Sequence, residues 1–327
     1  MRYATLGTSG VQVSRICFGT ATLGVAPLEK DVPALIDGCL ELGVNFIDTS
    51  NSYGYQPRFD RPGAPPADQR LPAEELLGNA LKGRRDDFIV ASKVMEPVGP
   101  GVNDRGLSRV HMMRQIEQSL RRLQTDHLDL YYAHHPDPNT PIETTVRVFD
   151  DLVRQGKIRY WALSTFSGAR VIEALWAAER LGAHPPVAHQ LRYNLDTRDV
   201  ELDALPASVR HGLGVNAFSP LAGGLLAGST TATREIGGAA RWGGRGHTEE
   251  QIAFASKLDA LAGEWGIPSA QLALCWLLSR PGISAAIIGP ETFAELTVNA
   301  AAADLDLEAE QLAQIDALNP SKVRGTP

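Results

Sequence analysis

The sequence predicts an α/β protein, a (β/α)8 barrel of the TIM type, from the order of its apolar segments. Short apolar runs alternate with longer amphipathic stretches, which is typical of parallel strands joined by helices. The alternation occurs eight times in 327 residues, which matches a closed barrel better than a doubly wound sheet of about five to seven strands. No linker-like or low-complexity segment interrupts it, so we expect residues 1–327 to form one domain.

The eight predicted strands are short and rich in Ile, Val, Leu and Phe. They are Ile16–Gly19, Asn45–Asp48, Phe88–Ser92, Leu128–Tyr132, Ile158–Leu163, Val187–His189, Val215–Phe218 and Ala285–Ile288. Helices are predicted where apolar residues recur every three or four positions. The clearest are Val32–Leu42, Ala73–Leu81, Ser108–Leu123, Ile142–Gln155, Ala169–Leu181, Glu250–Trp265 and Thr292–Ala303. Glycine suits the left-handed residue that ends many helices, and it follows five of these segments, as Gly43, Gly83, Gly156, Gly182 and Gly266.

Three further segments have a different pattern. Residues 3–13 read as two short strands around a Thr-Ser-Gly turn, a hairpin that we expect to close the bottom of the barrel. Residues 54–72 and 219–247 are long and irregular, and they follow the second and seventh predicted strands. Because a barrel carries its active site at the carboxyl ends of its strands, both are predicted to be extended active-site loops.

Composition excludes several classes of protein. Hydrophobic residues make up 43% and charged residues 21%, as in soluble globular proteins. The net charge of -7 lacks the attraction that nucleic acid requires, so we expect no nucleic-acid partner. No stretch approaches the roughly 20 apolar residues that span a bilayer, so we expect no membrane association and a cytoplasmic location. The three cysteines, Cys17, Cys39 and Cys275, are far apart, which argues against a disulfide framework or a zinc site.

Four ionisable or hydrogen-bonding side chains lie at or just beyond the ends of predicted strands. They are Asp48, Tyr53, Lys93 and His134. In a barrel these ends surround one mouth, so we expect the four to converge. An ammonium beside a phenol favours the phenolate, and Asp48 would keep Lys93 charged and oriented. Tyr53 is therefore predicted to donate a proton to an oxygen that His134 helps to position.

The segments that carry these residues resemble motifs of the aldo-keto reductase family. GVNFIDTSNSYG, residues 43–54, is similar to the family segment with the aspartate and the tyrosine. Ile89–Lys93 resembles the lysine strand, and LDLYYAHHPDP, residues 128–138, resembles the histidine strand. The resemblance covers nearly the whole chain. It implies NAD(P)H-dependent reduction of an aldehyde or ketone to an alcohol, without a Rossmann domain.

The same resemblance implies a set of cofactor contacts. Ser164, Thr165 and Gln190 match the positions that hold the nicotinamide carboxamide in the family, and Phe218 matches the aromatic residue that stacks on the nicotinamide. Thr165 stands where the family usually has asparagine. The other implied contacts are Ser219, Leu221, Gly223, Arg241, Gly289, Glu291, Glu295 and Asn299. Residues 221–247 are rich in glycine and contain three arginines, which suits a loop that closes over a pyrophosphate.

The choice between NADPH and NADH stays open at this point. Glu291 and Glu295 match positions near the adenosine 2'-phosphate, where the family often has serine, lysine, arginine or glutamine. A carboxylate there suits a free ribose hydroxyl, as in NADH, unless an arginine such as Arg241 lies between it and the phosphate. Thr292 and Glu295 also have the spacing of a capping box, which would explain Glu295 by itself.

Other interpretations remain open. The substrate is expected to be a small carbonyl compound, and loop 54–72 suits a polar or sugar-like one, or else has no part in substrate binding. Relatives that resemble potassium-channel β subunits suggest a nicotinamide-nucleotide-sensing regulatory subunit instead. A third possibility is a barrel lyase or isomerase. His134, His135 and Asp137 suggest a metal site, but adjacent residues of a strand point to opposite faces, so no metal is expected.

Overall fold

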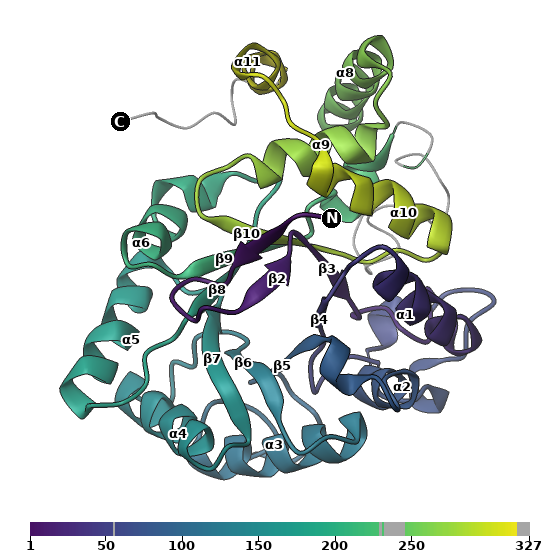
Figure 1. Ribbon diagram of the computed structural model, residues 1–327. Coiled ribbons are helices and arrows are strands. Elements are labelled where there is room, and N and C mark those ends of the chain that lie inside the picture. The colour runs from purple at the N-terminus through teal and green to yellow at the C-terminus, as the bar shows by residue number, and fades with distance from the viewer. Residues whose placement is uncertain (55, 229–230, 232–245, 319–327) are drawn as a thin grey trace.

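A computed structural model describes residues 1–54, 56–228, 231 and 246–318, and it confirms the predicted barrel (Figure 1). Eight parallel strands close in the order β10-β3-β4-β5-β6-β7-β8-β9. Their bounds are β3 Ile16–Gly19, β4 Phe46–Asp48, β5 Ile89–Val94, β6 Leu128–Ala133, β7 Ile158–Ser164, β8 Ala188–Arg192, β9 Gly214–Phe218 and β10 Ile283–Ile288. Each strand lies where the apolar runs predicted it, with small shifts at the ends.

The amino-terminal hairpin closes the end of the barrel at which the strands begin. Its strands are β1 (Tyr3–Thr5) and β2 (Gln12–Ser14), paired antiparallel. Leu6 is buried in the same apolar cluster as residues inside the barrel. Gly7 has φ +54°, and a Cβ there would lie 2.2 Å from the Val187 carbonyl oxygen, so the turn needs glycine for its close approach to β8. Figure 1 shows the hairpin lying across this end, as predicted.

Helices surround the barrel, and all seven of the predicted ones are present. The described α-helices are α1 Val32–Glu41, α2 Ala73–Ala80, α3 Arg109–Leu123, α4 Ile142–Arg154, α5 Gly168–Leu181, α6 Ala204–Arg210, α8 Glu249–Trp265, α9 Ser269–Leu278, α10 Phe293–Ala301 and α11 Ala309–Ala317. The sequence analysis did not single out α6, α9 and α11. Helix α9 is buried on nearly all sides, so it lacks the polar face that makes a helix recognisable.

The predicted glycine signals are correct. Gly43, Gly156, Gly182 and Gly266 all follow helices and have φ between 59° and 74°. Glycine is favoured in this left-handed region because it has no Cβ to clash with the backbone.

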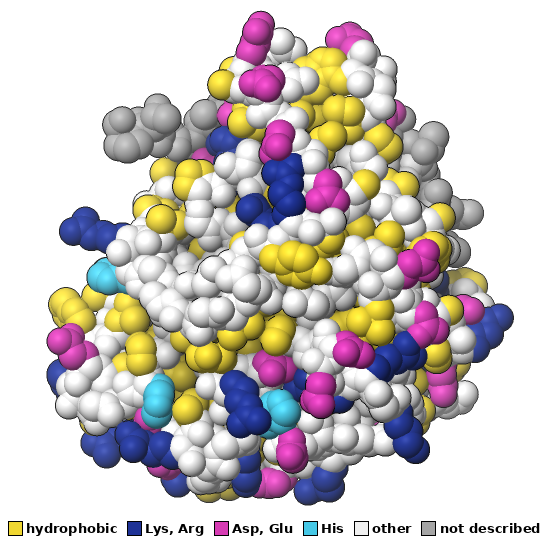
Figure 2. Space-filling model, viewed as in Figure 1, with side chains coloured by type: hydrophobic (Ala, Val, Ile, Leu, Met, Phe, Trp, Pro, Cys, Tyr) yellow, Lys and Arg dark blue, Asp and Glu magenta, His cyan; other side chains and the backbone are white. Residues whose placement is uncertain are grey.

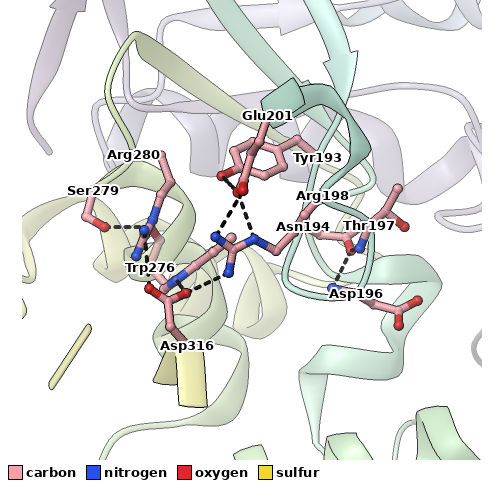
Figure 3. A network of polar contacts seen from close by, with 10 residues as sticks. All are labelled: Tyr193, Asn194, Asp196, Thr197, Arg198, Glu201, Trp276, Ser279, Arg280 and Asp316. Atoms are coloured by element: carbon pink, nitrogen blue, oxygen red, sulfur yellow. Dashed lines mark hydrogen bonds and ion pairs between the residues drawn. The ribbon is translucent and has the colours of Figure 1, made fainter. Parts of the chain in front are cut away.

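The carboxyl-terminal helix α11 is attached to the barrel by a network of polar contacts around Arg198 (Figure 3). Arg198 donates to both carboxylate oxygens of Glu201 at 2.7 and 3.1 Å, and to Asp316 of α11 at 2.7 Å. Trp276 of α9 also donates to Asp316, at 3.0 Å. The network joins the segment after β8 to two helices of the carboxyl-terminal part of the chain.

Two observations concern membrane-spanning helices and the distribution of charge. No helix of the described residues is long and apolar enough to cross a bilayer. On the face that carries the hairpin, basic and acidic side chains are interspersed (Figure 2). Cys17, Cys39 and Cys275 are buried free thiols, and burial raises the pKa of Cys39 to about 12.

Candidate active site

Three of the four predicted acid–base residues make direct contacts at the mouth of the barrel. Lys93 donates a hydrogen bond to Asp48 and lies 3.2 Å from the Tyr53 hydroxyl. It also donates to the backbone carbonyl of Thr49 at 2.8 Å. The lysine is fully buried and Asp48 nearly so, whereas Tyr53 is partly exposed. The arrangement is a buried ion pair that presents one donor to a phenol within reach of solvent.

The strand register explains why these residues meet. Asp48, at the end of β4, is the register partner of Ala91 in β5, and Lys93 lies two residues beyond Ala91. Residues two apart in a strand share a face, so Asp48 and Lys93 both point into the barrel. Tyr53 lies in the turn after β4, where its carbonyl oxygen accepts from the backbone N–H of Ala73 at 3.0 Å. The start of α2 therefore helps to place the phenol.

Lys93 carries its charge at neutral pH. Burial disfavours the ammonium, but the Asp48 carboxylate and the Tyr53 phenol outweigh that effect, and the pKa of Lys93 is raised above its ordinary value. A permanently charged lysine beside the phenol stabilises negative charge there and orients the hydroxyl.

His134 lies next to Tyr53, as predicted. The ring centroids are 5.9 Å apart in an edge-to-face arrangement, and the histidine Nδ1 lies 3.4 Å from the Ser50 hydroxyl. The backbone N–H of His134 donates to the Val94 carbonyl oxygen at 3.0 Å, which extends the pairing of β6 with β5 by one residue. The imidazole thus lies at the rim beside the phenol, where it can hydrogen-bond a substrate oxygen.

The prediction that His134 and His135 point to opposite faces is wrong. Strand β6 ends at Ala133, so the alternation stops, and the two rings stack with centroids 4.9 Å apart. His135 Nδ1 lies 2.6 Å from the Thr165 hydroxyl, and Nε2 lies 3.1 Å from a Glu96 oxygen. Within the described ranges no group of three His, Cys, Asp or Glu side chains could hold a metal ion.

The residues predicted to hold the nicotinamide carboxamide lie at the ends of β7 and β8. Ser164 and Gln190 are register partners, and Gln190 donates to the second oxygen of Asp48 at 2.8 Å. Thr165 has φ +59°, a left-handed conformation that a β-branched residue rarely adopts. Its hydroxyl lies against His135 and donates to the Ser164 carbonyl oxygen at 2.7 Å. The Thr165 hydroxyl is therefore engaged by partners within the protein.

His189 supports this turn and was missed by the sequence analysis. It is fully buried, and burial lowers its pKa to about 3, so it is neutral. Its Nε2 accepts from the Phe166 backbone N–H at 3.2 Å, and its Nδ1 lies 2.8 Å from the Ser208 hydroxyl. A histidine in a predicted strand carries no sequence signal for such a bond, because its partners lie 23 and 19 residues away.

The segment after β9 begins with the predicted contacts Phe218 and Ser219. Phe218 is partly exposed at the strand end, and Ser219 has φ +52° with its carbonyl oxygen accepting from the Asn194 side chain at 2.8 Å. Leu221 precedes the 3-10 helix Ala222–Ala227, inside which Gly223 has φ +69°. Arg241 lies outside the described residues.

The remaining predicted contacts follow β10. Gly289 comes directly after the strand, and Asn299 is a nearly buried residue of α10. Thr292 caps α10 by accepting from the Glu295 N–H at 3.2 Å, in accordance with the capping-box spacing. The Glu295 carboxylate accepts from the Glu291 N–H at 2.8 Å, one residue before the usual position. Glu295 is therefore used by the start of the helix.

Glu291 has a partner that the sequence analysis did not consider. Arg61, from the loop after β4, donates to both of its carboxylate oxygens at 3.2 and 3.4 Å. The sequence had suggested an arginine from the loop after β9, such as Arg241, as the intervening group. The two residues are 230 positions apart, so no spacing rule could have paired them.

A surface hollow of about 440 Å³ lies against the same loop. It is lined by residues after β3, such as Gly24 and Leu28, and by loop residues such as Gly63 and Pro65. None of the four acid–base residues lines it, so it is separate from the catalytic mouth.

The fold and this site define a class of protein: a (β/α)8 barrel in which a charged lysine, an aspartate and a tyrosine meet at the carboxyl ends of the strands. The family model described as "Aldo/keto reductase family" matches residues 15–320, and the chain belongs to that family. Membership supports an oxidoreductase that uses a nicotinamide cofactor. The sequence resemblance is thereby confirmed.

Similar proteins carry two kinds of name. The chain is 36% identical to "Uncharacterized oxidoreductase YrpG" of Bacillus subtilis (strain 168), over 100% of this chain and 98% of the relative. It is 34% identical to a "Probable voltage-gated potassium channel subunit beta" of Arabidopsis thaliana, over 93% of this chain and 92% of the relative. A protein of the same name from Oryza sativa subsp. japonica is also 34% identical, over 100% and 99%.

Proposed function

We propose that this protein reduces an aldehyde or a ketone to an alcohol with NAD(P)H, and that Tyr53 is the proton donor. The observation that carries the proposal is the Tyr53 hydroxyl 3.2 Å from Lys93 Nζ, with Lys93 in turn paired with Asp48. A phenol is a weak acid, and only an adjacent buried cation makes it a useful donor near neutral pH.

The residues at the mouth fit a nicotinamide cofactor. Ser164 and Gln190 offer neutral hydroxyl and amide groups, which suit a carboxamide, and the partly exposed Phe218 offers a ring face. When bound, the cofactor supplies the hydride for the carbonyl carbon. Gln190 would link this end of the cofactor to the acid–base group, because it already donates to Asp48.

The geometry supports the following roles for the chain's own residues. Tyr53 Oη gives its proton to the carbonyl oxygen as the new C–H bond forms, which yields the alcohol. Lys93 stabilises the phenolate that remains, and Asp48 holds the lysine. His134, beside the phenol, orients the carbonyl oxygen by a hydrogen bond. The loop after β4 contains arginines, which suit a polar or sugar-like substrate.

The test is Tyr53→Phe, with NADPH or NADH oxidation followed by absorbance against a panel of aldehydes and ketones. Loss of a positioned acid is expected to lower turnover by roughly 10² to 10⁴. Cofactor Kd should stay within about twofold, because the hydroxyl acts in the transition state. A variant that keeps more than about half of the wild-type rate would remove Tyr53 from the mechanism.

A second candidate is a nucleotide-binding regulatory subunit, since relatives at 34% identity over nearly the whole chain are named potassium channel β subunits. Such a protein would bind the cofactor but turn over carbonyl substrates very slowly, and it would co-purify with a partner. Rapid multiple turnover of a carbonyl compound by the isolated chain favours the first candidate. Tight cofactor binding with at most a single turnover favours the second.

A further inference from the structure

The loop after β4 extends beyond its own strand to reach the segment after β10. Arg61 forms a two-pronged contact with Glu291 and also donates to the Val25 carbonyl oxygen, after β3, at 3.0 Å. In the barrel β3 lies between β4 and β10. One guanidinium therefore joins the loops of three neighbouring strands.

The position of Arg61 is set by the internal structure of its loop. Arg70 has a side chain only 1% exposed and is paired with Asp60 at 2.7 Å. It also donates to the carbonyl oxygens of Gly54, Gln56 and Pro65 at 2.9 to 3.1 Å. Phe59 is buried as well. These contacts fix the chain on both sides of Arg61, so its direction toward Glu291 follows from the fold of the loop.

The charges around this contact affect how a phosphate would bind there. Glu291 occupies the position that family membership places near the 2' position of the adenosine. Its carboxylate would repel a phosphate, and Glu295 adds a second acidic group nearby. Glu295 and Thr292 also take up the N–H groups of residues 291 and 295. These two N–H groups near the start of α10 are therefore already paired within the protein.

Arg61 neutralises one of these two acidic groups and adds donors. Guanidinium has five N–H donors in a planar fork that suits phosphate oxygens. Its contacts within the described residues use three of them, two on Glu291 and one on Val25. Nε–H and one Nη1–H are left for a ligand. The side chain is 22% exposed and Glu291 is 30% exposed, so the pair can be reached from solution.

We propose that Arg61 determines the cofactor specificity of this protein, with its guanidinium compensating Glu291 and binding the 2'-phosphate of NADPH. The inference rests on the proposed function and adds a residue from the loop after β4 to the cofactor site. It assigns NADPH as the preferred cofactor, in spite of the two glutamates.

The experiment measures the Kd of the purified full-length chain for NADPH, NADH, 2',5'-ADP and 5'-AMP by calorimetry at low and high salt. Wild type should bind 2',5'-ADP at least about tenfold more tightly than 5'-AMP. Arg61→Gln should reduce that ratio by about tenfold or more and leave the Kd for 5'-AMP within about twofold. Arg61→Lys keeps the charge and should keep much of the ratio, while Glu291→Gln should raise it.

Arg84→Gln is the matched control. Arg84 is 24% exposed and pairs with Asp37, but it precedes β5 at the opposite end of the barrel. The nucleotide Kd values of this variant should equal those of wild type.

Two results would overturn the inference while the proposed function stands. One is a wild type that binds 5'-AMP as tightly as 2',5'-ADP, and the other is an Arg61→Gln variant whose ratio is unchanged. A wild type that binds neither dinucleotide would refute the proposed function as well. These readouts need no substrate, so the two failures are distinguishable.

Discussion

Two ion pairs at the carboxyl ends of the strands differ in burial. The side chains of Lys93 and Asp48 are 0% and 4% exposed, whereas those of Arg61 and Glu291 are 22% and 30% exposed. Strands place the first pair, and loops place the second. One chemical pairing thus occurs in two settings: the buried pair holds a charge beside the Tyr53 hydroxyl, and the partly exposed pair keeps a charge within reach of solvent.

Burial decides which of these pairs affects folding. Two charges inside a protein lose their hydration, and the pair persists only when its remaining atoms find partners. Asp48 has the Gln190 amide and Lys93 has the Thr49 carbonyl oxygen. Arg61 and Glu291 keep part of their hydration, so breaking this ion pair should lower the free energy of unfolding only slightly.

Breaking the buried pair should have the largest effect on stability. Lys93→Met leaves the Asp48 carboxylate buried without its counter-charge, and we expect the free energy of unfolding to fall by about 3–5 kcal/mol. Urea denaturation followed by circular dichroism measures this. The double variant Lys93→Met/Asp48→Asn should be more stable than the single one, because it removes the orphaned charge. A loss below about 1 kcal/mol would show that water reaches Asp48.

The free energy of unfolding should also depend on pH, through the buried His189. Its pKa is about 3 in the folded protein and near 6.5 in an unfolded chain. Between these values the unfolded chain binds a proton that the native state does not, so stability falls as pH falls, by about 1.4 kcal/mol per pH unit. From pH 7 to pH 5 this amounts to about 2 kcal/mol. His189→Gln should lose this part of the pH dependence, as measured by urea unfolding at both pH values. An equal change in the free energy of unfolding between the two pH values for wild type and His189→Gln would contradict this prediction.

A substitution of Arg70 tests how the loop that carries Arg61 is held in place. Arg70→Met removes one ion pair and leaves three carbonyl oxygens of the loop without their donor. We expect faster hydrogen exchange over residues 56–72, but a global loss of only about 1 kcal/mol, because this loop can open without the barrel. A cooperative loss of protection in β4 and β5 would instead show that the loop supports the barrel.

The smallest effect on folding is expected at Arg61. A partly exposed ion pair contributes about 0–1 kcal/mol, so Arg61→Gln should change the free energy of unfolding by about 0.5 kcal/mol or less. Thermal denaturation without ligand measures it. A destabilisation above about 1.5 kcal/mol would mean that the pair holds the loops together, and that the difference from Lys93 and Asp48 is one of degree only.

The barrel and the meeting of Asp48 with Lys93 could be predicted from the sequence alone. Eight apolar runs with amphipathic segments between them are local patterns, and a closed parallel barrel satisfies all of them at once. The carboxyl ends of parallel strands meet at one mouth, so residues at strand ends such as Asp48 and Lys93 could be brought together by topology alone. The glycines after the helices were predictable for the same reason, because the conformation they adopt is local.

Contacts that depend on the path of a loop could be recognised only in the folded chain. His134 and His135 stack because both lie beyond Ala133, the last residue of β6, where the alternation of a strand no longer applies. Arg61 reaches Glu291 because the buried Arg70 folds the loop around itself. Periodicity describes neighbours along one element, whereas these pairings arise from many long-range contacts acting together, and a guanidinium 230 residues from its carboxylate carries no sign of its partner in the sequence.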